Sequence, residues 1–146
     1  MKVTFESASL NETEVLIRGD ITDPDAMAVL EFIKSRTSAT KKLMLFKDDE
    51  QFLVNPDEVI YIEAAGNKVE VTATSGKYDS KKKLYELKEQ LSAEPFAQIN
   101  KGTLVNIDFV KSVQAEFSGN YSLRLKTGKE ILTISLKYFT EFKSNI

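Results

Sequence analysis

The sequence contains no cysteine and no histidine, and each absence excludes a class of site. Without cysteine there is no disulfide, no thiol nucleophile and no thiolate metal ligand, which suits a reducing compartment. Without histidine the chain lacks the commonest general base near neutral pH and the commonest metal ligand. A transition-metal enzyme or a histidine-dependent hydrolase is therefore not expected, and we expect no cofactor and no metal.

Long apolar runs and enzyme motifs are missing as well. The longest apolar runs, such as Leu43–Phe46 and Val59–Ile62, are too short to span a bilayer. The first six residues lack the apolar centre of a signal peptide. No phosphate-binding glycine loop, nucleophile elbow or HExxH zinc motif occurs. We therefore expect a cytoplasmic protein that is not an enzyme and has no small-molecule substrate.

Charge is distributed unevenly along the 146 residues. The whole chain carries 20 Lys/Arg and 22 Asp/Glu, a net charge of −2, which by itself disfavours a polyanion partner. Residues 96–146 hold seven Lys/Arg against four Asp/Glu, a net charge of +3. This last third is the part that could face a polyanion, although an ordinary solvated surface would show the same excess.

The first 42 residues predict a strand–strand–helix extension. Residues 2–8 and Thr13–Arg18 alternate between apolar and polar positions, as half-buried strands do. Asp23-Pro24 is a helix-start signal, and apolar residues recur at helical spacing from Met27 onward, which predicts a helix over Pro24–Thr37. A unit of this size is too small to be stable alone.

Residues 43–146 predict a second domain made mainly of short strands. Glycine, asparagine, aspartate and proline turns separate the apolar segments, as is typical of hairpins. A helix is predicted from about Ser80 to Leu91 and a terminal one over Leu136–Lys143. The predicted strands are Leu43–Phe46, Gln51–Val54, Val59–Glu63, Lys68–Thr74, Lys77–Asp79, Phe96–Ile99, Val110–Glu116, Tyr121–Lys126 and Glu130–Ile134. The fold class is therefore α+β, mostly antiparallel β with a few short helices.

Two polar segments of this domain are candidate anion contacts. Lys81, Lys82 and Lys83 stand at the predicted start of a helix, where free amides and cations together can hold a phosphate. The alternative, lysines that extend into water, is equally consistent with the pattern. A polar step, Asn100-Lys101-Gly102-Thr103, would display an amide, an ammonium and a hydroxyl at one edge of the domain. Taken alone, that step is more simply a solvated loop.

Several segments, in order and at matching spacing, resemble the LytTR family of bacterial DNA-binding domains. They are Ile60–Val69, Leu84–Leu87 with Leu91, Phe96–Asn106, and Ser135–Tyr138 with Phe142. The most specific string is Phe96, Ile99, Lys101, Leu104, Val105 and Asn106. The resemblance covers about residues 43–146 and implies a compact antiparallel β fold whose edge loops enter DNA grooves.

Carried over by position, the resemblance implies a set of DNA contacts. The loops would be Gly66-Asn67-Lys68, Asn100–Thr103 and Ser135-Leu136-Lys137, with Lys101 and Lys137 as the main base or phosphate donors. The full set of expected DNA-binding residues is Asn67, Lys68, Lys81, Lys82, Lys83, Asn100, Lys101, Thr103, Ser135 and Lys137.

This sequence departs from the family pattern at two places. Many members carry arginine near Lys137, and arginine or histidine near Gln98 and Asn100. Lysine lacks the two-pronged donor of arginine, so a guanine contact from Lys137 would be weaker.

The resemblance also implies partners. Stand-alone regulators of this family act on double-stranded promoter DNA with direct repeats, as dimers or paired monomers. They are often controlled by a membrane protein encoded beside them. Residues 1–42 are too short for a phosphorylated receiver domain, so they are a candidate surface for that membrane protein or for homodimerisation. Two alternatives stay open: a protein-interaction module that has lost DNA affinity, and a small-molecule-binding regulatory domain.

Overall fold

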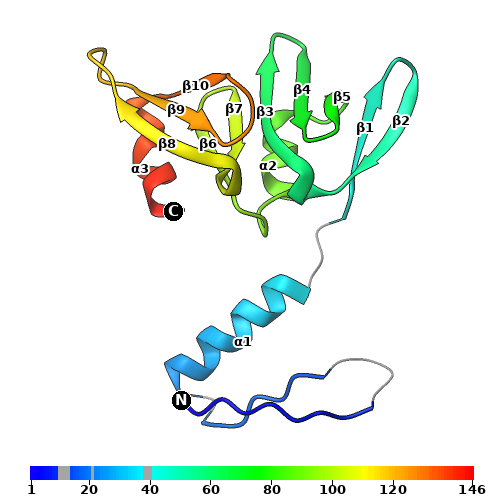
Figure 1. Ribbon diagram of the computed structural model, residues 1–146, viewed down its shortest axis with the longest axis vertical. Helices are drawn as coiled ribbons and strands as arrows, with labels where there is room; N and C mark the ends of the chain where they lie inside the picture. The colour runs from blue at the N-terminus through cyan, green and yellow to red at the C-terminus, as the bar shows by residue number, and fades with distance from the viewer. Residues whose placement is uncertain (10–13, 21, 38–40) are drawn as a thin grey trace. The chain divides into compact units, whose positions relative to one another are not determined.

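The chain forms two compact units, Met1–Ala39 and Thr40–Ile146, which are drawn in Figure 1. The computed structural model describes residues 1–9, 14–20, 22–37 and 41–146, and for residues 34–37 it describes the backbone alone. Within the described residues, no helix has the length and apolar character needed to cross a membrane.

The first unit contains the predicted helix, α1 (Pro24–Thr37), with the predicted bounds. Asp23 caps it, because its carboxylate accepts a hydrogen bond from the Asp25 amide at 3.0 Å. Before the cap, the hydroxyl and amide of Thr22 both donate to Asp20, and these bonds lower the pKa of that carboxyl.

The two strands predicted before α1 are not present as strands in the described residues. Residues 1–9 and 14–18 are extended but belong to no assigned strand, and Thr13 lies outside the described residues. The alternation of apolar residues was therefore an insufficient signal. A strand also needs a hydrogen-bonded neighbour, and an isolated pair of strands is marginal in water.

The second unit is built on an antiparallel sheet with the order β2-β1-β5-β4-β3-β7-β6. Its strands are β1 (Leu43–Lys47), β2 (Glu50–Val54), β3 (Val59–Ala65), β4 (Lys68–Ala73), β5 (Gly76–Ser80), β6 (Phe96–Asn100) and β7 (Thr103–Asn106). Single 3-10 turns, Pro56–Glu58 and Ile107–Phe109, precede β3 and β8. The mostly antiparallel fold class is confirmed.

A second antiparallel sheet completes the unit, in the order β10-β9-β8. Its strands are β8 (Val110–Ala115), β9 (Tyr121–Leu125) and β10 (Ile131–Ile134). Two helices accompany the sheets: α2 (Leu84–Gln90) connects β5 to β6, and α3 (Leu136–Ser144) follows β10 directly. Figure 1 shows α3 beside β6 and the small sheet.

Two apolar cores lie in this unit. The first core packs the large sheet against α2 and includes Leu45, Ile62, Val71, Leu87 and Leu104, all at most 1% exposed. The second core lies under the small sheet and α3 and includes Ile99, Val105, Leu123, Ile134 and Phe142. Neighbouring residues of one strand serve different cores, since Leu104 belongs to the first and Val105 to the second. β3 does the same, with Ile62 in the first core and Ile60 in the second, so β3 and β7 together form the seam between the cores.

Two elements differ from the sequence prediction. β7 was not predicted as a strand, because all four of its residues are buried and it shows no alternation to detect. The predicted helix from Ser80 to Leu91 is shorter, because Ser80 remains in β5 opposite Val69. The Ser80 hydroxyl accepts the Lys82 amide at 3.0 Å, which bends the chain before α2 begins.

Candidate nucleic-acid interface

Three turns of the second unit meet at one edge, which we call the loop edge. It consists of residues 66–68 at the β3–β4 turn, residues 100–102 at the β6–β7 turn, and residues 135–137 where β10 leads into α3. Lys68 is the first residue of β4, Asn100 is the last of β6, and Leu136 and Lys137 begin α3. The first two turns are joined by the backbone, where the Ala64 amide donates to the Gly102 carbonyl at 2.7 Å. Next to this bond, Glu63 of β3 lies opposite Thr103 of β7 in the antiparallel pair. The two turns therefore lie side by side.

The third turn is tied to the second by two hydrogen bonds. The Asn100 side-chain amide donates to the Thr133 carbonyl at 2.9 Å. The Ser135 amide donates to the Ile99 carbonyl, also at 2.9 Å. All three predicted loops are therefore held together by main-chain groups of β3, β6 and β10. The sequence order alone could not indicate this, because the loops are 30 or more residues apart.

The space beside Gly102 favours glycine, because little room is left for a Cβ atom at this junction. A Cβ atom built on Gly102 would stand 3.0 Å from the Ala64 carbonyl oxygen, which is closer than nearly all real Cβ contacts. The neighbour is backbone and cannot swing away as a flexible side chain would. Glycine here allows the two turns to approach each other closely.

Four of the predicted contact residues are exposed at the loop edge. They are Asn67, Lys68, Lys101 and Lys137. In the described part of the chain, Lys68, Lys101 and Lys137 form no ion pair. The ammonium of Lys137 lies 5.7 Å from the ring of Tyr138. Ser135, the fifth predicted residue here, is half-buried and precedes α3.

Asn100 and Thr103 are placed differently from the prediction that they display polar groups to a ligand. Asn100 is half-buried, and both ends of its amide are engaged, since its oxygen also accepts the Gly102 amide at 2.9 Å. Thr103 is only 5% exposed and is a residue of β7. The two-residue turn Lys101-Gly102 is tighter than the sequence indicated, so only Lys101 projects a charged group.

Lys81, Lys82 and Lys83 do not occupy the first turn of a helix, which corrects the basis on which they were predicted. Lys83 precedes α2 as its cap residue, and its amide donates to Glu86 at 3.2 Å. The Lys82 ammonium donates to Gln90 at 2.7 Å, and that of Lys81 lies 4.4 Å from the Phe46 ring. The argument from the helix dipole therefore does not apply.

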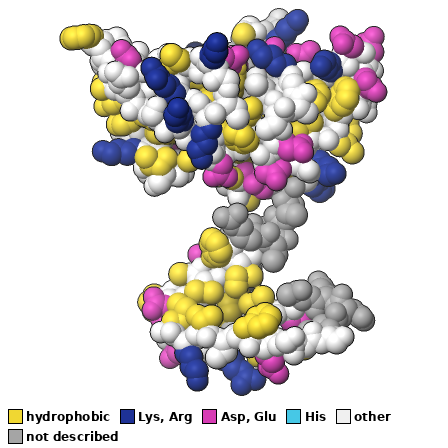
Figure 2. Space-filling view, in the orientation of Figure 1, with side chains coloured by type: hydrophobic (Ala, Val, Ile, Leu, Met, Phe, Trp, Pro, Cys, Tyr) yellow, Lys and Arg dark blue, Asp and Glu magenta, His cyan; other side chains and the backbone are white. Residues whose placement is uncertain are grey.

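The lysines nevertheless lie at the same end of the sheet as the loop edge. Val69 pairs with Ser80, so Lys68 and Lys81 are the next residues at one end of the β4–β5 pair. Figure 2 shows lysine and arginine side chains along the margin where the β3–β4 turn lies. Positive charge thus continues from the loop edge toward β5.

Other charges lie next to this edge or at a distance from it. Glu63, Glu70 and Asp79 are consecutive cross-strand neighbours on β3, β4 and β5. Glu70 is paired with Lys77 at 3.7 Å, but the row as a whole still carries negative charge, which disfavours DNA lying flat on this face. Part of the positive excess of residues 96–146 also lies elsewhere: Lys111, Arg124 and Lys129 line a hollow of about 320 Å³ at the far end of β10.

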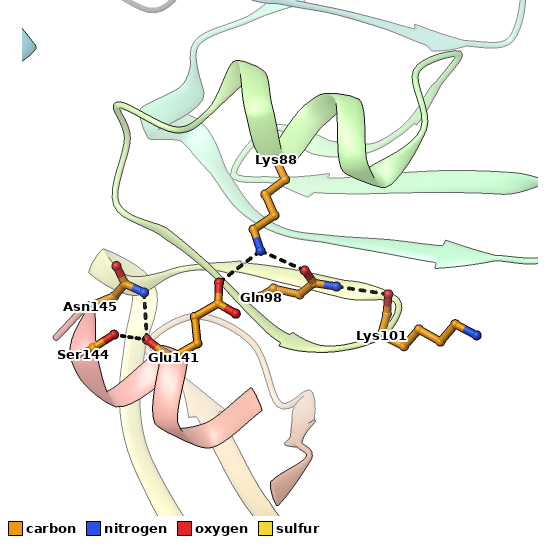
Figure 3. Close-up of polar contacts among 6 residues, drawn as sticks. All are labelled: Lys88, Gln98, Lys101, Glu141, Ser144 and Asn145. Atoms are coloured by element: carbon orange, nitrogen blue, oxygen red, sulfur yellow. Dashed lines mark hydrogen bonds and ion pairs between the residues drawn. The ribbon is translucent and has the colours of Figure 1, made fainter. Parts of the chain in front are cut away.

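A polar network that the sequence did not indicate supports the loop edge (Figure 3). The Lys88 ammonium contacts Gln98 and Glu141, each at 3.0 Å. The Gln98 amide in turn donates to the Lys101 carbonyl at 3.2 Å. Because Glu141 belongs to α3, which carries Lys137, the network links α2 to two of the three turns. No spacing rule connects residues so far apart.

Asn120 is a second residue that sequence reasoning missed. Its side-chain oxygen accepts the Leu136 amide at 3.2 Å and so caps the first turn of α3 from the β8–β9 hairpin. The sequence assigned Asn120 only to a turn. In the structure it also fixes the start of the helix beside Lys137.

Comparisons with known proteins point to one family. Residues 49–146 match the family model of the LytTr DNA-binding domain. The chain is 30% identical over 94 residues to the sensory transduction protein LytT of Oceanobacillus iheyensis, spanning 64% of this chain and 38% of that protein. It is 24% identical over 115 residues to LytT of Bacillus subtilis, spanning 79% of this chain and 47% of that protein. The chain thus matches less than half the length of these relatives.

The fold comparison agrees. A solved LytTr DNA-binding domain of a methyl-accepting/DNA response regulator from Bacillus cereus superposes with a TM-score of 0.66 at 23% identity. The superposition covers 72% of this chain and 95% of that domain. With the family model covering two thirds of the sequence and the same fold in space, the chain belongs to the LytTR family of DNA-binding domains.

Proposed function

We propose that this chain is a sequence-specific transcriptional regulator that reads double-stranded DNA with the loop edge. The observation that supports the proposal most directly is the meeting of three distant turns, each with an exposed lysine, at one margin of a rigid sheet. Lysines without ion-pair partners are available to neutralise phosphates or donate to base edges. The family of the domain supports DNA as the polyanion.

The residues take different roles in this proposal. Lys101 and Lys137 are the main donors to bases or phosphates, and Asn67 and Lys68 contact an adjacent groove or backbone. Ser135 offers its hydroxyl to a phosphate. Lys81, Lys82 and Lys83 contribute a weaker contact that does not depend on sequence. Asn100 and Thr103 act from within the fold, because their polar groups position the turn.

The proposal extends to the whole chain. Residues 43–146 form the DNA-binding domain, and residues 1–42 form an extension for a second copy or a membrane-protein regulator. Two copies would read promoter direct repeats. A protein with this role acts in the bacterial cytoplasm and performs no catalysis.

A second function, a protein-interaction module without DNA affinity, is favoured by two observations. The net charge is −2. Leu136-Lys137 also provides one cation at a place where the resemblance implies a guanidinium. Salt dependence distinguishes the two functions, because each neutralised phosphate adds to the slope of log affinity against log salt concentration.

The test is fluorescence anisotropy with labelled DNA from upstream of the protein's own gene and with a scrambled duplex, at about 50 and 200 mM salt. Tighter binding to the upstream DNA, weakening as salt rises, is expected. Absence of binding to either duplex at the lower salt concentration would reject the DNA-binding proposal and support the interaction module.

A further inference from the structure

The first unit exposes its apolar side chains. In the described part of residues 1–33, not one residue is buried. Val15, Ile17, Met27, Leu30 and Ile33 line a hollow of about 330 Å³ between the extended segment and α1. Figure 2 shows apolar side chains gathered in a continuous patch on one face of this unit.

An exposed apolar surface of this kind is stabilised when another apolar surface packs against it. The described residues of this unit reach half-burial at most, as at Ile17, Leu30 and Ile33, which offsets little of the conformational entropy lost when the segment is ordered. Val3, Phe5, Val15 and Leu16 are each between 64% and 94% exposed. Met27 of α1, which is 38% exposed, adds to this apolar surface.

The segment Glu14–Arg18 is self-complementary. It reads Glu-Val-Leu-Ile-Arg. Antiparallel pairing with the same segment of another copy, centred on Leu16, sets Glu14 against Arg18 and Val15 against Ile17. Both ends then pair opposite charges, and Val15 and Ile17 of the two copies share one face, while Leu16 lies on the other face with the charged pairs.

Pairing within one chain gives a poorer match of charges. The register that sets Val3 against Ile17 and Phe5 against Val15 is the one that places these four apolar side chains opposite one another. The same register sets Lys2 against Arg18 and Glu6 against Glu14. Like charges directly opposite each other are destabilising, so Glu14–Arg18 finds its complementary partner in another copy.

We propose that the occupant of the apolar face is a second copy of this chain, joined by antiparallel pairing of Glu14–Arg18 about a two-fold axis at Leu16. Such an interface is isologous and closes at two copies. Because Val15 and Ile17 line the hollow against α1, the pairing merges two hollows into one shared core. The proposal concerns residues 1–39 and does not depend on DNA binding by the second unit.

The test is sedimentation equilibrium of the full chain without DNA, comparing the wild type with Arg18→Glu and with the double variant Glu14→Arg/Arg18→Glu. The wild type is expected to be dimeric. Arg18→Glu sets two carboxylates against each other twice per dimer and should raise the dimer Kd about tenfold. The double variant restores opposite charges and should return within about threefold of the wild type.

Lys2→Glu is the matched control, because it makes the same change of charge on the other extended segment. Its Kd should stay close to that of the wild type, and circular dichroism should show the same helix content in every variant. A wild type that is monomeric at about 100 µM overturns the proposal, because the apolar face is then covered within one chain or by another protein. A dimer that Arg18→Glu leaves unchanged, or that Lys2→Glu disrupts equally, also overturns it. DNA affinity for a single repeat, measured separately, should be the same in all these variants.

Discussion

Lys101 is the residue at which exposure, charge and position coincide. It projects from a two-residue turn, while its carbonyl is fixed by Gln98. In Figure 3 its side chain extends away from the network that holds its backbone. The hydrogen bond from Gln98 fixes the backbone of Lys101 but does not involve its ammonium group. A specific contact requires a donor that is positioned in this way and still available.

Lys101→Ala should therefore weaken binding to the specific DNA by about 1–3 kcal/mol if it contacts a base. The measurement is anisotropy on specific and scrambled duplexes. Lys129→Ala is the matched control, since Lys129 lines a hollow at the opposite end of β10. Equal affinity of Lys101→Ala and the wild type would remove Lys101 from the site.

Asn100→Ala should lower the stability of the domain, since the side chain joins the second and third turns of the loop edge. The substitution leaves the Gly102 amide and the Thr133 carbonyl without their partner. We expect a loss of about 1–3 kcal/mol in the free energy of unfolding, measured with urea. Gln98→Ala is the comparison and should cost less, because both Gln98 bonds are exposed whereas the bond between Asn100 and the Gly102 amide is part-buried. A smaller loss for Asn100→Ala than for Gln98→Ala would contradict the assignment.

The residue roles show where sequence reasoning reached its limit. The position of Lys101 in a turn, of Lys68 at the start of a strand and of Lys137 at the start of the last helix could be predicted from local pattern and family resemblance. The burial of Thr103 could not, because it depends on pairing with Glu63, forty residues earlier. Lys88 and Asn120 were missed for the same reason, since their partners come from other elements.

At the scale of elements, the β1–β2 hairpin has an unusual turn. Asp48 and Asp49 both have positive φ, at 50° and 66°, as a type I′ turn requires. Aspartate tolerates this conformation, but glycine adopts it without strain. Asp49→Gly should therefore raise the free energy of unfolding by roughly 0.5–1 kcal/mol, and Asp49→Ala should lower it. Thermal unfolding of the two variants checks the sign, and a stabilising alanine would refute the strain.

The Lys88 network connects elements but should contribute little to stability. The Lys88 and Glu141 side chains are 44% and 42% exposed, so solvent screens their ion pair. A double-mutant cycle with Lys88→Met and Glu141→Gln should give a coupling energy below about 1 kcal/mol that decreases with salt. A larger coupling that does not change with salt would show that the pair is effectively buried.

Most elements of the second unit could be predicted because turns and alternating apolar residues mark them in the sequence. The exceptions have physical reasons. β7 is buried on both faces, and α2 begins late because Ser80 pairs in β5. The extended segments before α1 alternate as strands do, yet their pairing is decided by partners that the local pattern does not contain.

At the scale of the whole molecule, the lysines of the loop edge and of residues 81–83 belong to a chain whose net charge is −2. DNA binding should therefore be steeply dependent on salt and orientation. Replacing Lys81, Lys82 and Lys83 together by alanine should lower affinity for specific and scrambled DNA alike and flatten the salt slope. Anisotropy across a salt series measures both quantities. A loss limited to the specific duplex would instead assign base contacts to these lysines.

Under the DNA-binding proposal, the seam along β3 and β7 sets the spacing of the contact residues. Lys68 begins β4, whose buried residues belong to the first core, whereas Lys137 follows β10, whose buried residues belong to the second. The distance between Lys68 and Lys137 therefore depends on how the two cores meet along β3 and β7, and not on the packing within either core. A substitution that leaves each core well packed can still shift one core against the other by an ångström. Under the DNA-binding proposal, such a substitution would change which DNA site is preferred. The free energy of unfolding of the protein would stay the same.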